Sequence, residues 1–230
     1  MKYYAMSDIH GNVKALDEAL TLIDLNNPDN KLVLLGDYVH GGDSVAVLDK
    51  VMALEEKYGK DRVVVLRGNH EELVLEGESL FLHDTVEKKI SDADLSKYKR
   101  WMKQLRLFYR TEDQIFVHAG LNEGDDDGIT DDNRTVDDYL LGTPDDWFTN
   151  MYPPNIGKFV TDVIAGHTGT HKISGNLDFH NIYYDGQAHF YIDGSVQYSG
   201  VIPVLMYVTD TREYYSLSRD GKRLLKLCDI

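Results

Sequence analysis

The chain has 230 residues, 39 acidic against 24 basic, and its formal net charge of -15 argues against nucleic acid or acidic membranes as partners, because both need basic patches. At about 100–200 residues per domain, this length suits a single domain over residues 1–230 with a sizeable core. The single cysteine, Cys228, and the lack of any run near the roughly 20 apolar residues of a membrane span predict a cytoplasmic protein without an intrachain disulfide.

Strands and helices are predicted to alternate in the first third of the chain. Residues 2–7 have a short strand pattern, and Asn12 can cap the helix that follows. The apolar residues of 31–37 predict a buried strand, Ser44 can cap a second helix, and residues 63–66 predict a third strand. This order predicts parallel strands joined by right-handed crossovers.

The rest of the chain has a less regular pattern. Residues 71–110 keep helical spacing as far as Phe108 and Tyr109, and residues 143–154 are rich in turn formers. Short strands are expected at 115–117 and 163–165. From residue 178 onward, aromatic and β-branched residues predict β-hairpins. Their expected turns are Asp185-Gly186, Asp193-Gly194 and Asp220-Gly221.

Five apolar runs each end in side chains that can bind a metal ion. These side chains are Asp8 and His10, then Asp37, then Asn69 and His70, then His118, then His167. A single histidine of this kind is more often a hydrogen-bonded core residue. In open α/β sheets, however, the carboxyl ends of the strands form the binding crevice, so five such endings predict one shared metal site.

The ligand types suit two ions with Asp37 as the bridge. The first ion is assigned to Asp8, His10 and Asp37, and the second to Asp37, Asn69, His118 and His167. Imidazole, carboxylate and amide oxygen together favour divalent transition metals, manganese first and iron or zinc as alternatives. Two ions that share a carboxylate can clamp a phosphate and provide hydroxide to attack phosphorus.

The blocks around these residues resemble the signature of the calcineurin-like metallophosphoesterases. The blocks are Asp8-Ile9-His10-Gly11, Gly36-Asp37-Tyr38-Val39, Gly68-Asn69-His70-Glu71, His118-Ala119-Gly120 and Gly166-His167. Within this superfamily the chain is most similar to the phosphoprotein phosphatase branch, in particular the compact bacterial and phage serine/threonine phosphatases. The resemblance implies an α/β fold in which a β-sandwich is flanked by helices (α/β/β/α), with a dinuclear metal site at the strand ends.

The resemblance also implies roles for single residues. The six ligands named above match the family's metal ligands, His70 matches a histidine that protonates the leaving group, and Arg67 matches an arginine that grips the phosphate. The alternative for Arg67 is a structural salt bridge. In this branch the second block continues with aspartate and arginine, whereas this chain has His40 and Gly41. We expect His40 to share the acid role with His70, and Arg134 is a candidate for a second phosphate contact.

Three functions remain open on the sequence. The first is a metal-dependent phosphomonoesterase, a serine/threonine protein phosphatase-like enzyme acting on protein phosphoserine or phosphothreonine. The second is a hydrolase of dinucleoside polyphosphates or other small phosphorylated metabolites. The third, suggested by the change at His40 and Gly41, is a metal-binding regulator with weakened chemistry.

Overall fold

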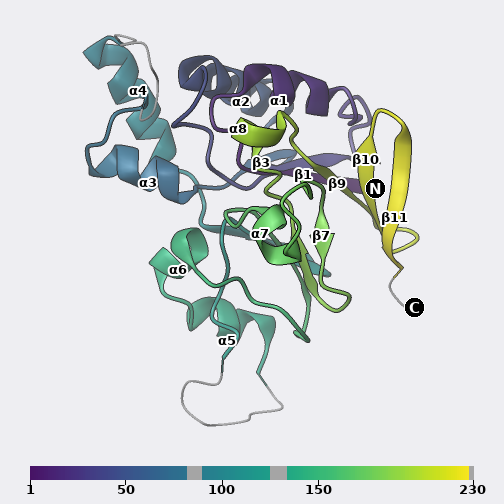
Figure 1. Cartoon of the computed structure of the whole chain (residues 1–230). Coiled ribbons are helices and arrows are strands. Elements are labelled where there is room, and N and C mark those ends of the chain that lie inside the picture. Colours follow the sequence, from purple (N-terminus) through teal and green to yellow (C-terminus); the bar gives the residue numbers. More distant parts are fainter. Residues whose placement is uncertain (82–89, 125–133, 228–230) are drawn as a thin grey trace.

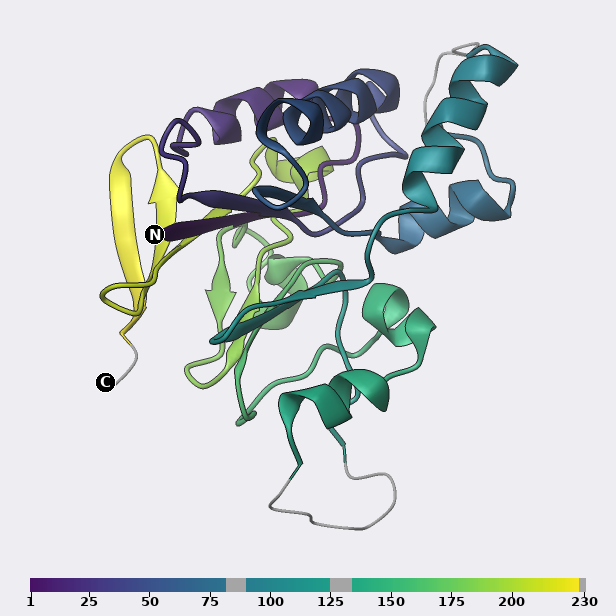
Figure 2. The same ribbon diagram turned by 180° about the vertical axis from the view of Figure 1, so that it is seen from behind.

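The computed structural model consists of two β-sheets packed face to face, and helices cover both outer faces (Figures 1 and 2). The structure describes residues 1–81, 90–124 and 134–227, so Cys228 lies outside the described residues. The layers confirm the predicted α/β/β/α fold class. The expectation of one domain over residues 1–230 stays a prediction.

The first sheet has six strands in the order β11-β10-β9-β1-β2-β3. They are β1 (Lys2–Met6), β2 (Lys31–Leu34), β3 (Val63–Val65), β9 (Val204–Val208), β10 (Glu213–Ser218) and β11 (Gly221–Leu227). β1, β2 and β3 run parallel and are joined through α1 (Val13–Leu20) and α2 (Ser44–Tyr58), which confirms the predicted alternation. Parallel strands joined in this way bring their carboxyl ends to one edge of the sheet.

The second sheet has five strands in the order β4-β5-β6-β8-β7. They are β4 (Phe108–Arg110), β5 (Gln114–Val117), β6 (Asp162–Ala165), β7 (Tyr183–Tyr184) and β8 (His189–Tyr191). The central strands β5, β6 and β8 are parallel, and the two outer strands are antiparallel to their neighbours. The carboxyl ends of β5 and β6 therefore also lie side by side.

Side chains alternate between two cores along the central strands. In β1, Tyr4 and Met6 point into the cluster beneath α1 and α2, whereas Tyr3 and Ala5 point into the cluster between the sheets, where they meet residues such as Phe116. Successive side chains of a strand face opposite sides, so a strand with both faces covered needs apolar residues throughout. This requirement explains the continuous apolar runs of β1 to β3.

The remaining helices pack on the outer face of one sheet or the other. They are α3 (Asn69–Glu76), α4 (Asp92–Met102), α5 (Val136–Leu141), α6 (Asp145–Asn150), α7 (Thr170–Ser174) and α8 (Val196–Ser199). α5 and α6 lie on the side of the second sheet that faces away from the first (Figure 1), where Leu140 and Phe148 pack. Val74 of α3, Tyr98 of α4 and Val196 of α8 instead belong to the core beneath α1 and α2. Among the described residues, no helix combines the length and apolar character needed to cross a membrane.

The helix starts agree with the sequence at α1 and differ at α2. Asn12 caps α1 as predicted, since its side chain accepts from Ala15 N at 3.0 Å. Asp43, not Ser44, caps α2, because the Asp43 carboxylate accepts from Ala46 N at 3.2 Å. Ser44 is instead the first helical residue of α2.

Three further expectations about local structure were wrong. The helical spacing of residues 71–110 does not continue to its end, because Phe108 and Tyr109 lie in β4 and pair with β5. Residues 143–154 contain α6 rather than turns alone. Asp193-Gly194 leads into α8 instead of a hairpin, whereas Asp185-Gly186 and Asp220-Gly221 do connect antiparallel strands.

Candidate active site

The predicted ligands lie together where the parallel strands end. Backbone hydrogen bonds connect the loops that follow the strands: His10 N donates to Asp37 O at 2.9 Å, and Gly166 N donates to His118 O at 2.8 Å. The His118 ring, from the second sheet, donates through Nδ1 to Leu35 O at 3.0 Å, next to the end of β2. Side chains from both sheets therefore reach one edge of the sandwich.

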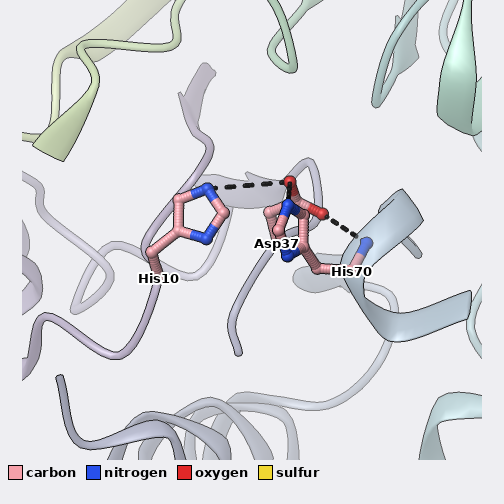
Figure 3. Close-up of side chains that lie close together, drawn as sticks. All are labelled: His10, Asp37 and His70. Carbon is pink, nitrogen blue, oxygen red and sulfur yellow. Dashed lines mark hydrogen bonds and ion pairs between the residues drawn. The ribbon is translucent and has the colours of Figure 1, made fainter. Parts of the chain in front are cut away.

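Asp37 lies at the centre of this cluster. Its Oδ2 atom is 3.7 Å from His10 Nε2, 3.7 Å from His70 Nε2 and 3.4 Å from His118 Nε2, and Figure 3 shows His10 pointing at this carboxylate. Two groups of donor atoms, each within 4.8 Å of one another, share Asp37: His10, Asp37 and His70 form one, and Asp37, His118 and His167 the other. A carboxylate in both groups is placed as a bridging ligand must be.

The other predicted ligands lie around Asp37. Asp8 Oδ1 is 3.9 Å from His10 Nε2, and Asp8 Oδ2 accepts from His167 N at 3.0 Å. Asn69 Oδ1 lies 3.0 Å from His118 Nε2 and 3.1 Å from His167 Nδ1. The structure thus brings all six predicted ligands into one cluster.

Backbone carbonyls orient two of the histidines. His10 donates through Nδ1 to Val39 O at 3.1 Å, and His118 donates through Nδ1 to Leu35 O at 3.0 Å. Each ring therefore presents Nε2 to Asp37, which is the arrangement that metal-binding histidines usually have. Together with the carboxylates and the amide oxygen, these nitrogens fit divalent transition ions.

Charge within the cluster is balanced between acids and imidazoles. Burial raises the pKa of Asp37, but the charges of His118 and His10 outweigh this and hold that pKa far below its usual range. Burial lowers the pKa of His118, but Asp37 and Asp8 together raise it to about 10. A cation that binds here has to displace protons from imidazole, so metal binding should weaken as pH falls.

Glu71 is a residue of the site that the sequence reasoning missed. Its fully buried carboxylate accepts from Asp37 N at 2.8 Å, Tyr38 N at 2.8 Å and Gly68 N at 2.9 Å. Burial and the charge of Asp37 raise the pKa of Glu71 to about 7, and the three N–H bonds oppose that rise. Glu71 fixes the Asp37 loop to the start of α3. The sequence did contain one signal for Glu71: it is the third residue of a helix, where a glutamate can bond to backbone N–H groups at the start of that helix.

Four of the predicted ligands have left-handed backbone conformations. The φ angles are 53° at Asp8, 43° at His10, 58° at Asp37 and 62° at His167. A residue other than glycine in such a conformation costs on the order of 1–3 kcal/mol, and such residues cluster at functional sites. The loop that carries Gly68 also packs closely on Asp37, because a Cβ added at Gly68 would lie 2.2 Å from Asp37 Oδ1.

His70 lies in the first donor group, where Asp8 was expected, and contacts His40. The two Nδ1 atoms are 2.7 Å apart, and His40 Nε2 is 2.7 Å from Ser79 O. Because a carbonyl only accepts, His40 donates through Nε2, and a neutral His40 accepts at Nδ1 from His70. Burial lowers the pKa of His40 and lowers that of His70 to about 4, so both rings are neutral and His70 presents its Nε2 lone pair to Asp37.

The two predicted phosphate contacts lie in different surroundings. Arg67 is two residues before Asn69. Its Nε atom is buried without a hydrogen-bond partner among the described residues, and Glu72 Oε1 lies 3.6 Å away from it. Arg134 lies beside α5, where it donates to Gly124 O at 3.4 Å and stacks over the Tyr139 ring. A phosphate contact stays a prediction for both arginines.

Comparison with known proteins agrees with this geometry. The family model for calcineurin-like phosphoesterases matches residues 1–198. Symmetrical bis(5'-nucleosyl)-tetraphosphatases of Nitrosomonas europaea and Nitrosospira multiformis are each 32% identical over 126 residues, 53% of this chain. The matched stretch spans only 45% and 44% of the lengths of these two relatives.

Solved structures of low sequence identity share the fold. A cold-active protein-tyrosine phosphatase of a psychrophilic Shewanella has a TM-score of 0.64 at 16% identity, over 98% of this chain and 80% of that one. A protein serine/threonine phosphatase from Saccharomyces cerevisiae has a TM-score of 0.62 at 15% identity, over 91% of this chain and 73% of that one.

Proposed function

The chain belongs to the calcineurin-like phosphoesterases, and on this premise we propose that it is a metal-dependent phosphoesterase whose substrates are dinucleoside polyphosphates. One observation carries the proposed chemistry: Asp37 is shared by both donor groups, so one carboxylate faces two cation positions. The names of the relatives that are 32% identical support the substrate class. The reaction would add one water across a P–O–P anhydride.

Different residues of the chain would bind the metal ions and the phosphate in this reaction. Two divalent ions, manganese first and iron or zinc as alternatives, would be held by Asp8, His10, Asp37, Asn69, His118 and His167. When bound, the ions supply positive charge for phosphate oxygens and lower the pKa of a nearby water. Arg67 can contact the phosphate with two parallel N–H bonds.

His70 is the residue that we expect to give a proton to the leaving oxygen. Its Nδ1–H is used in the bond to His40, so the proton has to come from Nε2, on the side that faces Asp37. His70 must therefore take up a second proton before it can donate. His40 is fully buried and bonded to Ser79 O, so it would support the acid role through His70 rather than reach the substrate.

Hydrolysis of protein phosphoserine or phosphothreonine is the second candidate. The blocks Gly36-Asp37-Tyr38-Val39 and Gly68-Asn69-His70-Glu71, which resemble those of phosphoprotein phosphatases, favour it. The same residues would hold the metals and the phosphate in both reactions. The two candidates differ only in what is attached to the attacked phosphorus.

Direct competition between substrates tests these proposals. Manganese-loaded protein is incubated with diadenosine tetraphosphate, a phosphoserine peptide and an activated aryl phosphate, and the products are separated by anion exchange. We expect a nucleoside diphosphate from the first substrate at the highest kcat/KM. Faster turnover of the peptide would favour the second candidate. No turnover of any substrate, the aryl phosphate included, would favour a metal-binding regulator.

A further inference from the structure

A cavity of about 330 Å³ opens beside the metal-competent cluster. His10 and His70 form part of its lining. The other lining residues belong to the segment 169–172, which includes the start of α7, and to residues 193–198 around α8. Figure 1 labels both helices. Its volume falls in the range of roughly 300–1,000 Å³ that is typical of small-ligand sites. Groups attached to a phosphate at the cluster can therefore extend into this space.

Hydrogen bonds hold the wall of the cavity in place. Gln197 of α8 donates through Nε2 to His40 O at 3.1 Å, and Ser195 Oγ lies 3.1 Å from His171 Nδ1 of α7. Ser195 has a left-handed φ of 52°, and its N–H donates to Asp193 Oδ1 at 2.6 Å. The two short helices are thus fixed to each other and to the loop of His40, so the wall is formed before a ligand binds.

Lys172 gives this cavity its positive charge. Among the described residues that line the cavity it is the only lysine or arginine, and Asp193 is the only carboxylate. It lines the same cavity as His10 and His70, so its charge lies beside the cluster. In a chain of net charge -15, a cation next to this site suits an anionic ligand.

Tyr198 adds an aromatic surface at the same cavity. It lies in α8, and 86% of its surface is exposed. Nucleobases stack on exposed aromatic side chains with little regard to base identity. The cavity therefore combines a cation for phosphate oxygens with a ring for a base.

We propose that this cavity binds the part of a dinucleoside polyphosphate beyond the attacked phosphorus, with Lys172 contacting phosphate oxygens and Tyr198 stacking on a nucleobase. This inference rests on the proposed function.

Binding without turnover tests the assignment. Calorimetry measures the affinity of the manganese-loaded protein for a methylene-bridged analogue of diadenosine tetraphosphate, for tripolyphosphate and for adenosine monophosphate. The variants are Lys172→Met and Lys172→Arg, then Tyr198→Ala and Tyr198→Phe. Lys60→Met, an exposed lysine outside this cavity, is the matched control.

The two side chains should affect different probes. Lys172→Met should weaken binding of the analogue and of tripolyphosphate roughly tenfold, whereas Lys172→Arg retains most of the affinity because it keeps the charge. Tyr198→Ala should weaken binding of the analogue and of adenosine monophosphate by about tenfold and leave tripolyphosphate unchanged, with Tyr198→Phe close to wild type.

Failure of this inference can be told from failure of the proposed function. If wild type hydrolyses diadenosine tetraphosphate while Lys172→Met and Tyr198→Ala bind the analogue normally, the subsite is wrong and the function stands. If wild type binds the analogue in a Lys172- and Tyr198-dependent way without hydrolysing the substrate, the subsite stands and the function is wrong. If wild type does neither, both are overturned.

Discussion

His40 Nδ1 lies 2.7 Å from His70 Nδ1, and the other nitrogen of His40 is bonded to Ser79 O. The pair therefore consists of two bases, one buried and one facing the metal-competent cluster. A neutral imidazole stabilises a charged neighbour less than a carboxylate does. The proton that His70 is proposed to donate should consequently be harder to hold in this chain than in relatives with aspartate at this position.

His40→Asp should raise turnover of substrates with poor leaving groups. A carboxylate beside Nδ1–H of His70 raises the pKa of His70, so the charged form is available at higher pH. We expect kcat for a phosphoserine peptide, whose alkoxide is a poor leaving group, to rise about tenfold, and kcat for an activated aryl phosphate to change little. His40→Asn is the control, because asparagine has the shape of aspartate without its charge. An equal response of both substrate types would remove His40 from the acid chemistry.

Asp37→Asn should abolish both cation positions at once. The carboxylate belongs to both donor groups, and an amide lacks the charge that balances two cations. We expect mass spectrometry of purified protein to find fewer bound metal ions per chain and hydrolysis to fall at least about 1000-fold. Asp49→Asn, in α2, should change neither result. Retained hydrolysis in the Asp37 variant would mean that the proposed site is not the catalytic one.

Gly68→Ala should damage the site while the fold persists. The added Cβ would lie 2.2 Å from Asp37 Oδ1 and 2.6 Å from Asp37 N, so Asp37 or the start of α3 has to move. A shift of this size can cost about 100-fold in rate. Gly142→Ala is the control, because its φ is -83° and the nearest atom to its new Cβ is a carbonyl oxygen at 3.1 Å. Circular dichroism should show both variants folded, and wild-type kcat/KM for Gly68→Ala would contradict the prediction.

His189 should make stability depend on pH. Its Nδ1 lies 2.9 Å from Asp185 Oδ2 and its Nε2 lies 2.9 Å from Glu123 Oε1. Burial lowers its pKa, but the bonds to Glu123 and Asp185 outweigh burial and raise that pKa above the usual 6.5. Since the folded chain holds this proton more tightly than the unfolded chain does, the stabilisation is complete below about pH 6.5 and is lost as pH rises through the raised pKa.

His189→Gln tests this contribution by urea unfolding at several pH values. The variant should lose roughly 3 kcal/mol of unfolding free energy near pH 6, because two carboxylates lose a buried charged partner. The difference from wild type should shrink as pH rises. His180→Gln, outside this cluster, is the control variant. A difference that stays constant with pH would assign His189 a packing role only.

The correct predictions about the site relied on patterns among residues that are close together in the sequence. Asp8 and Asp37 follow short apolar runs, and parallel strand order alone brings such residues to one edge. Glu71 lacked this kind of signal, because the N–H groups that it binds in Asp37 and Tyr38 are 34 and 33 residues away. Lys172 was missed for another reason: it follows His167 closely in the chain but belongs to no recognisable motif, and only the fold places it in one cavity lining with His10 and His70.

The wrong predictions of local structure have a similar origin. Phe108 and Tyr109 fit helical spacing and strand spacing equally well over so short a stretch, and pairing with β5 decides in favour of a strand. At α2 two adjacent residues, Asp43 and Ser44, could both cap a helix, and a one-residue choice of this kind lies below what sequence pattern can resolve.

The left-handed backbone at Asp8, His10, Asp37 and His167 lowers the stability of the folded chain in order to keep metal-binding side chains at these positions. Glycine adopts this conformation freely, so a lineage released from selection for hydrolysis would gain thermal resistance by drifting to glycine at these positions. Such drift would erase the ligands first and leave the sandwich intact. That aspartate and histidine occupy all four positions is what we expect of a chain that still binds metal ions.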